Sequence, residues 1–208
     1  MTGADSSSKR AMCERCLRAQ SSCICNWIRP LTSAAQVLIL QHPLEVAQAK
    51  GSGRLLHLSL TDSVLAQGEQ FDEAVLRDLL FGGGIQPVLL YPRTPGEPAG
   101  ALPDLSTPER LRLVILDATW RKSRKMLYLN PLLQVLPRLP LVDPPASQYR
   151  IRKAHRADQL STLEAACHAL GQLEDAAARY LPLLQAFDGF VAQQGSYVPA
   201  DVLNDPPA

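Results

Sequence analysis

The stretch L-R-L-V-I-L-D-A-T-W, residues Leu111–Trp120, decides the fold and locates its principal site. Its core, Leu113–Leu116, is a run of branched apolar residues, the pattern of a strand buried on both faces of a sheet. The next residues, Arg121–Met126, show no strand alternation and are predicted to be helical. Open α/β sheets bind their ligands just beyond the carboxyl ends of buried strands. The sequence therefore predicts an α/β fold with a polar site at Asp117–Trp120.

Further strands and helices alternate along the chain, which predicts a mostly parallel sheet with flanking helices. The expected strands before the central one are Gln36–Leu40 and Pro87–Tyr91, and helices are expected at 45–49, 72–80, after Ser161 and from about Leu181. Ser161 and Glu164 have the spacing of a capping box. The sequence contains neither a G-x-G-x-x-G loop nor a P-loop, so a cofactor would be held without those glycine cradles.

Composition sets the class of protein and its expected organisation. The chain has 208 residues, 46% of them hydrophobic, which fits one globular domain. No apolar run approaches the roughly 18 to 20 residues of a membrane span, and the amino terminus lacks the apolar segment of a secretory signal. We expect a cytoplasmic protein with no membrane contact. The expected organisation is a disordered leader (1–11), a zinc-binding module (12–30), a catalytic domain (31–195) and a tail (196–208).

Four of the five cysteines lie within thirteen positions, at Cys13, Cys16, Cys23 and Cys25. Disulfides are rare in cytosolic proteins, whereas four thiolates at this spacing suit tetrahedral zinc. A site with four protein ligands has no open position for a substrate, so the predicted zinc is structural. The alternative is four buried cysteines without a metal.

Basic residues are concentrated after the central strand, although the net charge is only +1. Residues 121–156 contain nine lysines and arginines and one acid, and residues 157–208 contain seven acids and one base. Such a cationic segment favours a polyanion such as RNA, because phosphate contacts release condensed counterions. The alternative is a solvated surface that pairs with the acidic carboxyl-terminal segment.

Two motifs give the sequence a family resemblance. The first is L-D-A-T-W-R-K-S-R-K-M, followed by L-P-R-L-P-L, and the second is S-Q-Y-R-I-R-K at 147–153. In these two motifs the sequence resembles the DTW-domain family. The C-x-x-C and C-x-C cysteine pairs also agree with this family. Ala19 stands near a position where relatives often carry proline. The resemblance covers about residues 13–184. It implies a SPOUT-like fold with a C-terminal trefoil knot. It also implies a tRNA-uridine aminocarboxypropyltransferase that uses S-adenosylmethionine, with tRNA as partner and no obligatory protein partner.

The resemblance also suggests roles for individual residues. Asp117 is the candidate general base, although a solvated carboxylate is a weak base for a ring NH and this role therefore requires burial. The alternative is that Asp117 caps the following helix. Candidate cofactor-binding residues are Leu116, Asp117, Thr119, Trp120, Tyr149, Arg150, Ile151, Arg152, Ser161 and Thr162. Candidate RNA-binding residues are His42, Arg54, Arg121, Arg124, Lys125 and Lys153.

Two other functions remain open at this point. A methyltransferase would use the same cofactor but transfer the methyl group, and only the orientation of the cofactor separates the two reactions. A non-catalytic zinc module that binds RNA would explain the cysteines and the basic segment. It would not explain a polar motif at the end of a buried strand.

Overall fold

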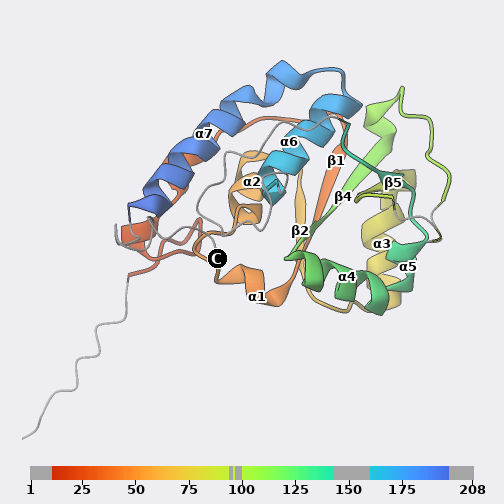
Figure 1. Cartoon of the computed structure of the whole chain (residues 1–208), viewed down its shortest axis with the longest axis horizontal. Coiled ribbons are helices and arrows are strands. Elements are labelled where there is room, and N and C mark those ends of the chain that lie inside the picture. The colour runs from red at the N-terminus through yellow and green to blue at the C-terminus, as the bar shows by residue number, and fades with distance from the viewer. Residues whose placement is uncertain (1–10, 94–95, 97–99, 143–159, 197–208) are drawn as a thin grey trace, which may run out of the picture.

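The computed structural model describes residues 11–93, 96, 100–142 and 160–196 (Figure 1). Within these residues the centre of the molecule is a five-stranded, wholly parallel sheet with the strand order β2-β1-β4-β3-β5. The strands are β1 (Gln36–Gln41), β2 (Val64–Gln67), β3 (Gln86–Leu90), β4 (Leu111–Asp117) and β5 (Arg138–Leu139). The predicted α/β class and parallel sheet are confirmed.

Helices cover both faces of this sheet. They are α1 (Pro43–Val46), α2 (Gly53–Ser59), α3 (Glu73–Phe81), α4 (Trp120–Leu129), α5 (Pro131–Gln134), α6 (Thr162–Leu173) and α7 (Ala177–Gly195). Helices α2, α6 and α7 lie on one face, and α3, α4 and α5 lie on the other (Figure 1). Short 3-10 turns occur at Gln20–Ser22, Cys25–Trp27, Gly82–Gly84 and Pro108–Arg110. No helix among the described residues is long and apolar enough to cross a membrane.

The central strands are apolar on both sides because each side packs against helices. Val37, Ile39, Leu113 and Ile115 belong to the core under α2, α6 and α7. The alternate residues Leu38, Leu40 and Val114 belong to a second core with residues of α3, α4 and α5. Successive side chains of a strand point to opposite faces, so Asp117 lies on the face that carries α2 and α6. Gln41 of β1 lies on the same face.

The connections that leave the neighbouring parallel strands β1 and β4 lead to opposite sides of the sheet. From β1 the chain continues to β2 on one side, and from β4 it passes beyond β3 to β5 on the other side. This divergence makes the carboxyl ends of β1 and β4 the topological switch point, where open α/β sheets bind their ligands. Gln41 and Asp117 are register partners there, and the His42 N–H donates to the Asp117 carbonyl at 3.0 Å.

Several elements differ from the sequence-based expectation. Strand β2 was not predicted, because Val64–Gln67 is an edge strand without a fully buried position. Helix α2 covers a segment whose uniform apolar character gave no assignable period. Helix α7 begins at Ala177 and contains Pro182. Tyr180 and Leu183 are buried there, and their packing outweighs the backbone hydrogen bond that proline cannot make.

The segment around the cysteines shares its core with the rest of the fold. Ile24 and Ile28 pack in the same cluster as Phe187 and Phe190 of α7. The predicted leader and tail, except residues 11 and 196, and the segment 143–159 lie outside the described residues. The knot therefore stays a prediction.

Candidate functional site

Asp117 lies at the switch point and is held by side chains from two other elements. Its carboxylate is buried, with 3% of the residue exposed. One oxygen, Oδ2, accepts a hydrogen bond from Gln41 Nε2 at 2.8 Å, and Oδ1 accepts one from Thr162 Oγ1 at 2.6 Å. The carboxylate therefore links β4 to the end of β1 and the start of α6, in the water-poor position that a catalytic base requires.

Helix α4 begins just after Asp117, but Asp117 does not occupy its N-cap position. The N-cap is Thr119, and its side chain makes no capping hydrogen bond. Thr119 and Trp120 are exposed at this end. The first-turn N–H groups of α4 can thus bind an anionic group of a ligand, which fits the expected cofactor contacts of both residues. Leu116, another expected contact, is partly buried beneath them.

The start of α6 is fixed by its own cap, as the sequence predicted. Ser161 Oγ accepts from the Glu164 N–H at 3.2 Å, and the Glu164 carboxylate accepts from the Ser161 N–H at 2.8 Å. The Leu163 N–H donates to Ser52 Oγ of the loop before α2. Ser161 is therefore buried as a cap, and Thr162 is the residue of this pair that reaches Asp117.

Gly53 lets α2 approach Asp117 closely, a contact that the sequence did not reveal. A Cβ atom at residue 53 would lie 2.5 Å from the Asp117 carboxylate carbon, far inside normal contact distance. We expect Gly53→Ala to displace the carboxylate, to cost about 1 to 3 kcal/mol of stability and to lower activity. Thermal melting and a turnover assay measure both effects.

Gly195→Ala is the matched control for this change, because a Cβ there meets no atom within 4 Å. Gly195 is the last residue of α7, and alanine there should leave activity unchanged. Equal melting temperatures and rates for Gly53→Ala and the wild-type protein would contradict the close approach.

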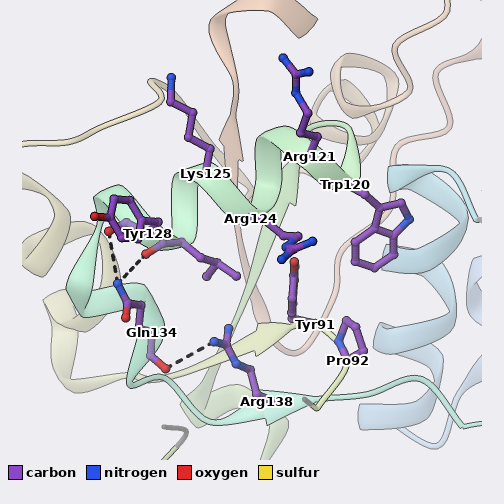
Figure 2. Close-up of a pocket in the computed structure, with 10 residues that line it drawn as sticks. Tyr91, Pro92, Trp120, Arg121, Arg124, Lys125, Tyr128, Gln134 and Arg138 are labelled. Atoms are coloured by element: carbon purple, nitrogen blue, oxygen red, sulfur yellow. Dashed lines mark hydrogen bonds between the residues drawn. The ribbon is translucent and has the colours of Figure 1, made fainter. Parts of the chain in front are cut away.

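A groove opens beside the first turn of α4. We call it the α4 groove; it has a volume of about 960 Å³ and is lined by Tyr91, Pro92, Trp120, Arg121, Arg124, Lys125, Leu127, Tyr128, Gln134 and Arg138. Figure 2 shows Arg124 and the Tyr91 hydroxyl directed toward the same space between α4 and β5. Trp120 is half exposed and packs edge-on against Tyr91, with ring centroids 5.6 Å apart.

The basic residues of α4 differ in their pairing. Lys122, which we did not predict as a site residue, pairs with the buried Glu45 at 3.0 Å, and Lys125 pairs with Glu69 at 2.8 Å. The hydrogen bond from Lys125, with a second from His42, holds the pKa of the Glu69 carboxyl below its usual range. In the described part of the chain, Arg121 and Arg124 make no ion pair or hydrogen bond.

His42 and Arg54, two expected RNA contacts, have structural surroundings instead. His42 is buried, its Nδ1 accepts from the Leu44 N–H, and its Nε2 lies 2.9 Å from Glu69 Oε1. Arg54 donates to the Arg15 carbonyl at 3.1 Å, which ties α2 to the cysteine segment. Their expected contacts with RNA stay predictions.

The four predicted metal ligands come together at the amino-terminal end of the described chain. The Sγ atoms of Cys13, Cys16, Cys23 and Cys25 all lie within 4.8 Å of one another. The Cys13–Cys25 and Cys16–Cys23 pairs are 3.6 and 3.7 Å apart. A tetrahedral zinc with Zn–S bonds of about 2.3 Å requires S···S distances of about 3.8 Å. The cluster therefore fits a zinc ion.

The thiols of this cluster differ in how readily they ionise. A backbone hydrogen bond from Cys16 is the main cause that lowers the pKa of the Cys13 thiol to about 6, whereas burial raises the pKa of Cys25 to about 12. The Cys13 thiol is thus more readily available as a thiolate at neutral pH than the Cys25 thiol, and a bound dication would favour deprotonation of the ligands.

The second family motif, at 147–153, lies outside the described residues. The expected contacts with cofactor and RNA therefore stay predictions for Tyr149, Arg150, Ile151, Arg152 and Lys153. The chain reaches this segment after β5 and leaves it at the start of α6, beside Asp117.

The fold and the site define the class: an α/β protein with a parallel sheet, a buried carboxylate at its switch point and a cysteine cluster that could bind a metal. The model of the DTW domain matches residues 10–195. The chain belongs to the DTW-domain family.

Three relatives carry names that describe an activity. A protein of Drosophila melanogaster named tRNA-uridine aminocarboxypropyltransferase 2 is 31% identical, over 82% of this chain and 70% of its own length. A protein of the same name from Mus musculus is 31% identical, over 91% of this chain and 66% of its own length. In Arabidopsis thaliana, tRNA-uridine aminocarboxypropyltransferase A is 24% identical, over 59% of this chain and 52% of its own length.

The chain thus spans about two thirds of the length of the two animal relatives. No solved structure gives a significant match.

Proposed function

We propose that this chain transfers the 3-amino-3-carboxypropyl group of S-adenosylmethionine to the ring nitrogen N3 of a uridine in tRNA. The observation that carries this proposal is the family match over residues 10–195, with relatives named for this transfer. The buried carboxylate at the switch point supports it, because the reaction needs a group that removes a proton from uracil.

The bond changes define what the protein must do. Uracil N3 loses its proton and bonds to the methylene carbon next to the sulfonium, and the bond between that carbon and sulfur breaks to release 5′-methylthioadenosine. The cofactor supplies a good leaving group, so the protein mainly positions both partners. We assign the proton to the carboxylate of Asp117, which Gln41 and Thr162 hold in place.

The residues around the switch point fit the charges of S-adenosylmethionine. The uncapped first turn of α4 and the exposed Thr119 offer donors for the cofactor's carboxylate. The negative charge of Asp117 complements a sulfonium nearby. We propose Leu116, Thr119, Thr162 and the backbone N–H of Trp120 as cofactor contacts, together with Tyr149–Arg152, of which Arg152 would pair bidentately with the cofactor's carboxylate.

The finer features of the fold and setting are also part of this proposal. They comprise a SPOUT-like domain with a C-terminal trefoil knot, and a structural zinc at the cysteine cluster. With tRNA as its substrate, the protein would act in the cytoplasm.

One experiment tests the reaction directly. Purified protein is incubated with tRNA and S-adenosylmethionine, the RNA is digested, and mass spectrometry weighs the modified nucleoside and the released thionucleoside. The proposal requires an aminocarboxypropyl uridine and methylthioadenosine. A methylated uridine with S-adenosylhomocysteine would identify a methyltransferase, and binding without any product would identify an RNA-binding module.

A further inference from the structure

The α4 groove has a charge that suits one kind of ligand. Four of its lining side chains are cationic, at Arg121, Arg124, Lys125 and Arg138, and none of the described lining residues is acidic. S-adenosylmethionine carries a sulfonium and an ammonium against one carboxylate, so it is a net cation at neutral pH. A groove with this lining disfavours the cofactor and favours a polyanion.

The cations of the groove are not equivalent. Lys125 is engaged by Glu69, whereas Arg121 and Arg124 are exposed and, in the described ranges, have no partner. Figure 2 shows that Arg124 extends into the groove and that Arg121 and Lys125 point outward along α4. Arg138 is buried at the floor, with its guanidinium carbon 5.3 Å from the centroid of the Tyr91 ring. Arg124 is therefore the cation best placed to meet a phosphate.

Aromatic side chains stand exposed at the rim of the same groove. Tyr128 is 80% exposed and Trp120 is 50% exposed, which leaves large ring surfaces in contact with water. Exposed aromatic rings interleaved with cations are the surface on which unpaired bases stack while their phosphates are neutralised. A regular duplex keeps its bases stacked internally and could use only the cations.

We propose that the α4 groove binds an unpaired stretch of the RNA substrate, with bases stacked on Tyr128 and Trp120 and a phosphate on Arg124. This inference rests on the proposed function and adds where and in what form the RNA is held. Trp120 is the first residue of α4, three positions after Asp117. A strand stacked along α4 would thus lead toward the switch point, where the target uridine must present N3.

The test measures RNA binding without turnover. A short fluorescent oligouridylate and an RNA duplex of equal nucleotide number are titrated with protein at several salt concentrations. We expect the single strand to bind more tightly, and Tyr128→Ala to weaken its binding by about 5- to 150-fold, the range for loss of one stacked base. Tyr128 is largely exposed, so its removal should leave the melting temperature nearly unchanged. Oligouridylate should also quench the fluorescence of the wild-type protein more than that of Trp120→Phe.

Charge variants test the phosphate contact. Arg124→Gln should flatten the salt dependence for the single strand by about 0.7 in the log–log slope, and Lys125→Gln should change it less because Lys125 already pairs with Glu69. Arg77→Gln is the matched control, since Arg77 is an exposed arginine of α3, paired with Glu73 and remote from the groove lining. It should change neither slope nor affinity.

Three outcomes would overturn the inference. Oligouridylate binding that is unchanged in both Tyr128→Ala and Arg124→Gln would remove the groove from RNA recognition. Equal binding of duplex and single strand, insensitive to Tyr128→Ala, would reduce it to a basic surface. Calorimetry in which both variants lose S-adenosylmethionine affinity and keep oligouridylate affinity would make it the cofactor's site. Failure of the proposed function is separate, because it appears as unmodified tRNA while the wild-type protein still binds oligouridylate as expected.

Discussion

Replacing Asp117 by asparagine should lower single-turnover aminocarboxypropyl transfer by about 100-fold or more, the usual effect of losing a general base. Asparagine cannot take up the proton of uracil N3, but it can keep both observed hydrogen bonds. Its oxygen can accept from Gln41, and its NH₂ group can donate to the Thr162 hydroxyl, which serves as donor or acceptor. The variant should therefore fold and bind tRNA.

Thr162→Val separates chemistry from positioning. Valine keeps the branched shape but removes the hydroxyl that donates to Asp117 Oδ1. If Asp117 is the base, this variant should lose about 1 kcal/mol of stability and retain far more activity than Asp117→Asn. If Asp117 only fastens α6 to β4, Asp117→Asn, which can keep both hydrogen bonds, should lose no more stability or rate than Thr162→Val.

Three measurements on Asp117→Asn distinguish the possible roles of this residue: cofactor affinity by calorimetry, melting temperature, and the single-turnover rate. A fall in S-adenosylmethionine affinity that matches the fall in rate would make Asp117 a cofactor-binding residue. A turnover rate near that of the wild-type protein would remove Asp117 from the mechanism.

The centre of the fold could be predicted because its sequence pattern is compatible with only one arrangement of strand and helices. Leu113–Leu116 is apolar at every position, and helices on both faces of the sheet are the arrangement that buries all four side chains. The edge strand Val64–Gln67 has no such pattern, since it is partly exposed along its length. The capping box at Ser161 could be predicted because both of its hydrogen bonds join residues close together in the sequence.

The surroundings of the site were less predictable because they depend on residues far apart in the chain. The missing Cβ of Gly53 makes room for Asp117, a residue 64 positions later that no local sequence pattern connects with it. The charge count showed a basic segment, but it could not show that Glu45 and Glu69 pair with Lys122 and Lys125. Helical spacing and charge alone do not distinguish these lysines from Arg124.

Removing the proposed zinc ion should have the largest effect on stability. The cysteine segment has little secondary structure of its own. Besides the apolar packing of Ile24 and Ile28, a few contacts join it to the rest of the fold. Trp27 bonds to Gln193 of α7, Gln193 donates to the Cys23 carbonyl at 3.2 Å, and the Arg18 guanidinium lies 5.3 Å from the Phe190 ring centroid. Without a central ion these contacts must order the segment alone.

Loss of the proposed zinc should also disturb the position of Asp117 at the switch point. Arg18 donates to the Gly51 carbonyl at 2.8 Å, and Arg54 donates to the Arg15 carbonyl at 3.1 Å. These bonds fix the segment that carries Gly53 against Asp117. Since structural zinc contributes its binding energy to folding, a loss of about 3 kcal/mol would lower the melting temperature of a chain of this size by roughly 6 to 12 °C. Activity should fall with it.

Metal analysis and melting with and without a strong chelator measure this effect. We expect about one zinc per chain in the wild-type protein and much less in Cys16→Ser, with a matching drop in melting temperature. Cys167→Ala is the control, because Cys167 is a buried cysteine of α6 outside the cluster; it should keep its zinc despite a packing cost. Zinc-free protein that melts at the same temperature as the untreated protein would show that contacts such as Trp27–Gln193 suffice, and that the four thiols need no metal to hold this segment against α7.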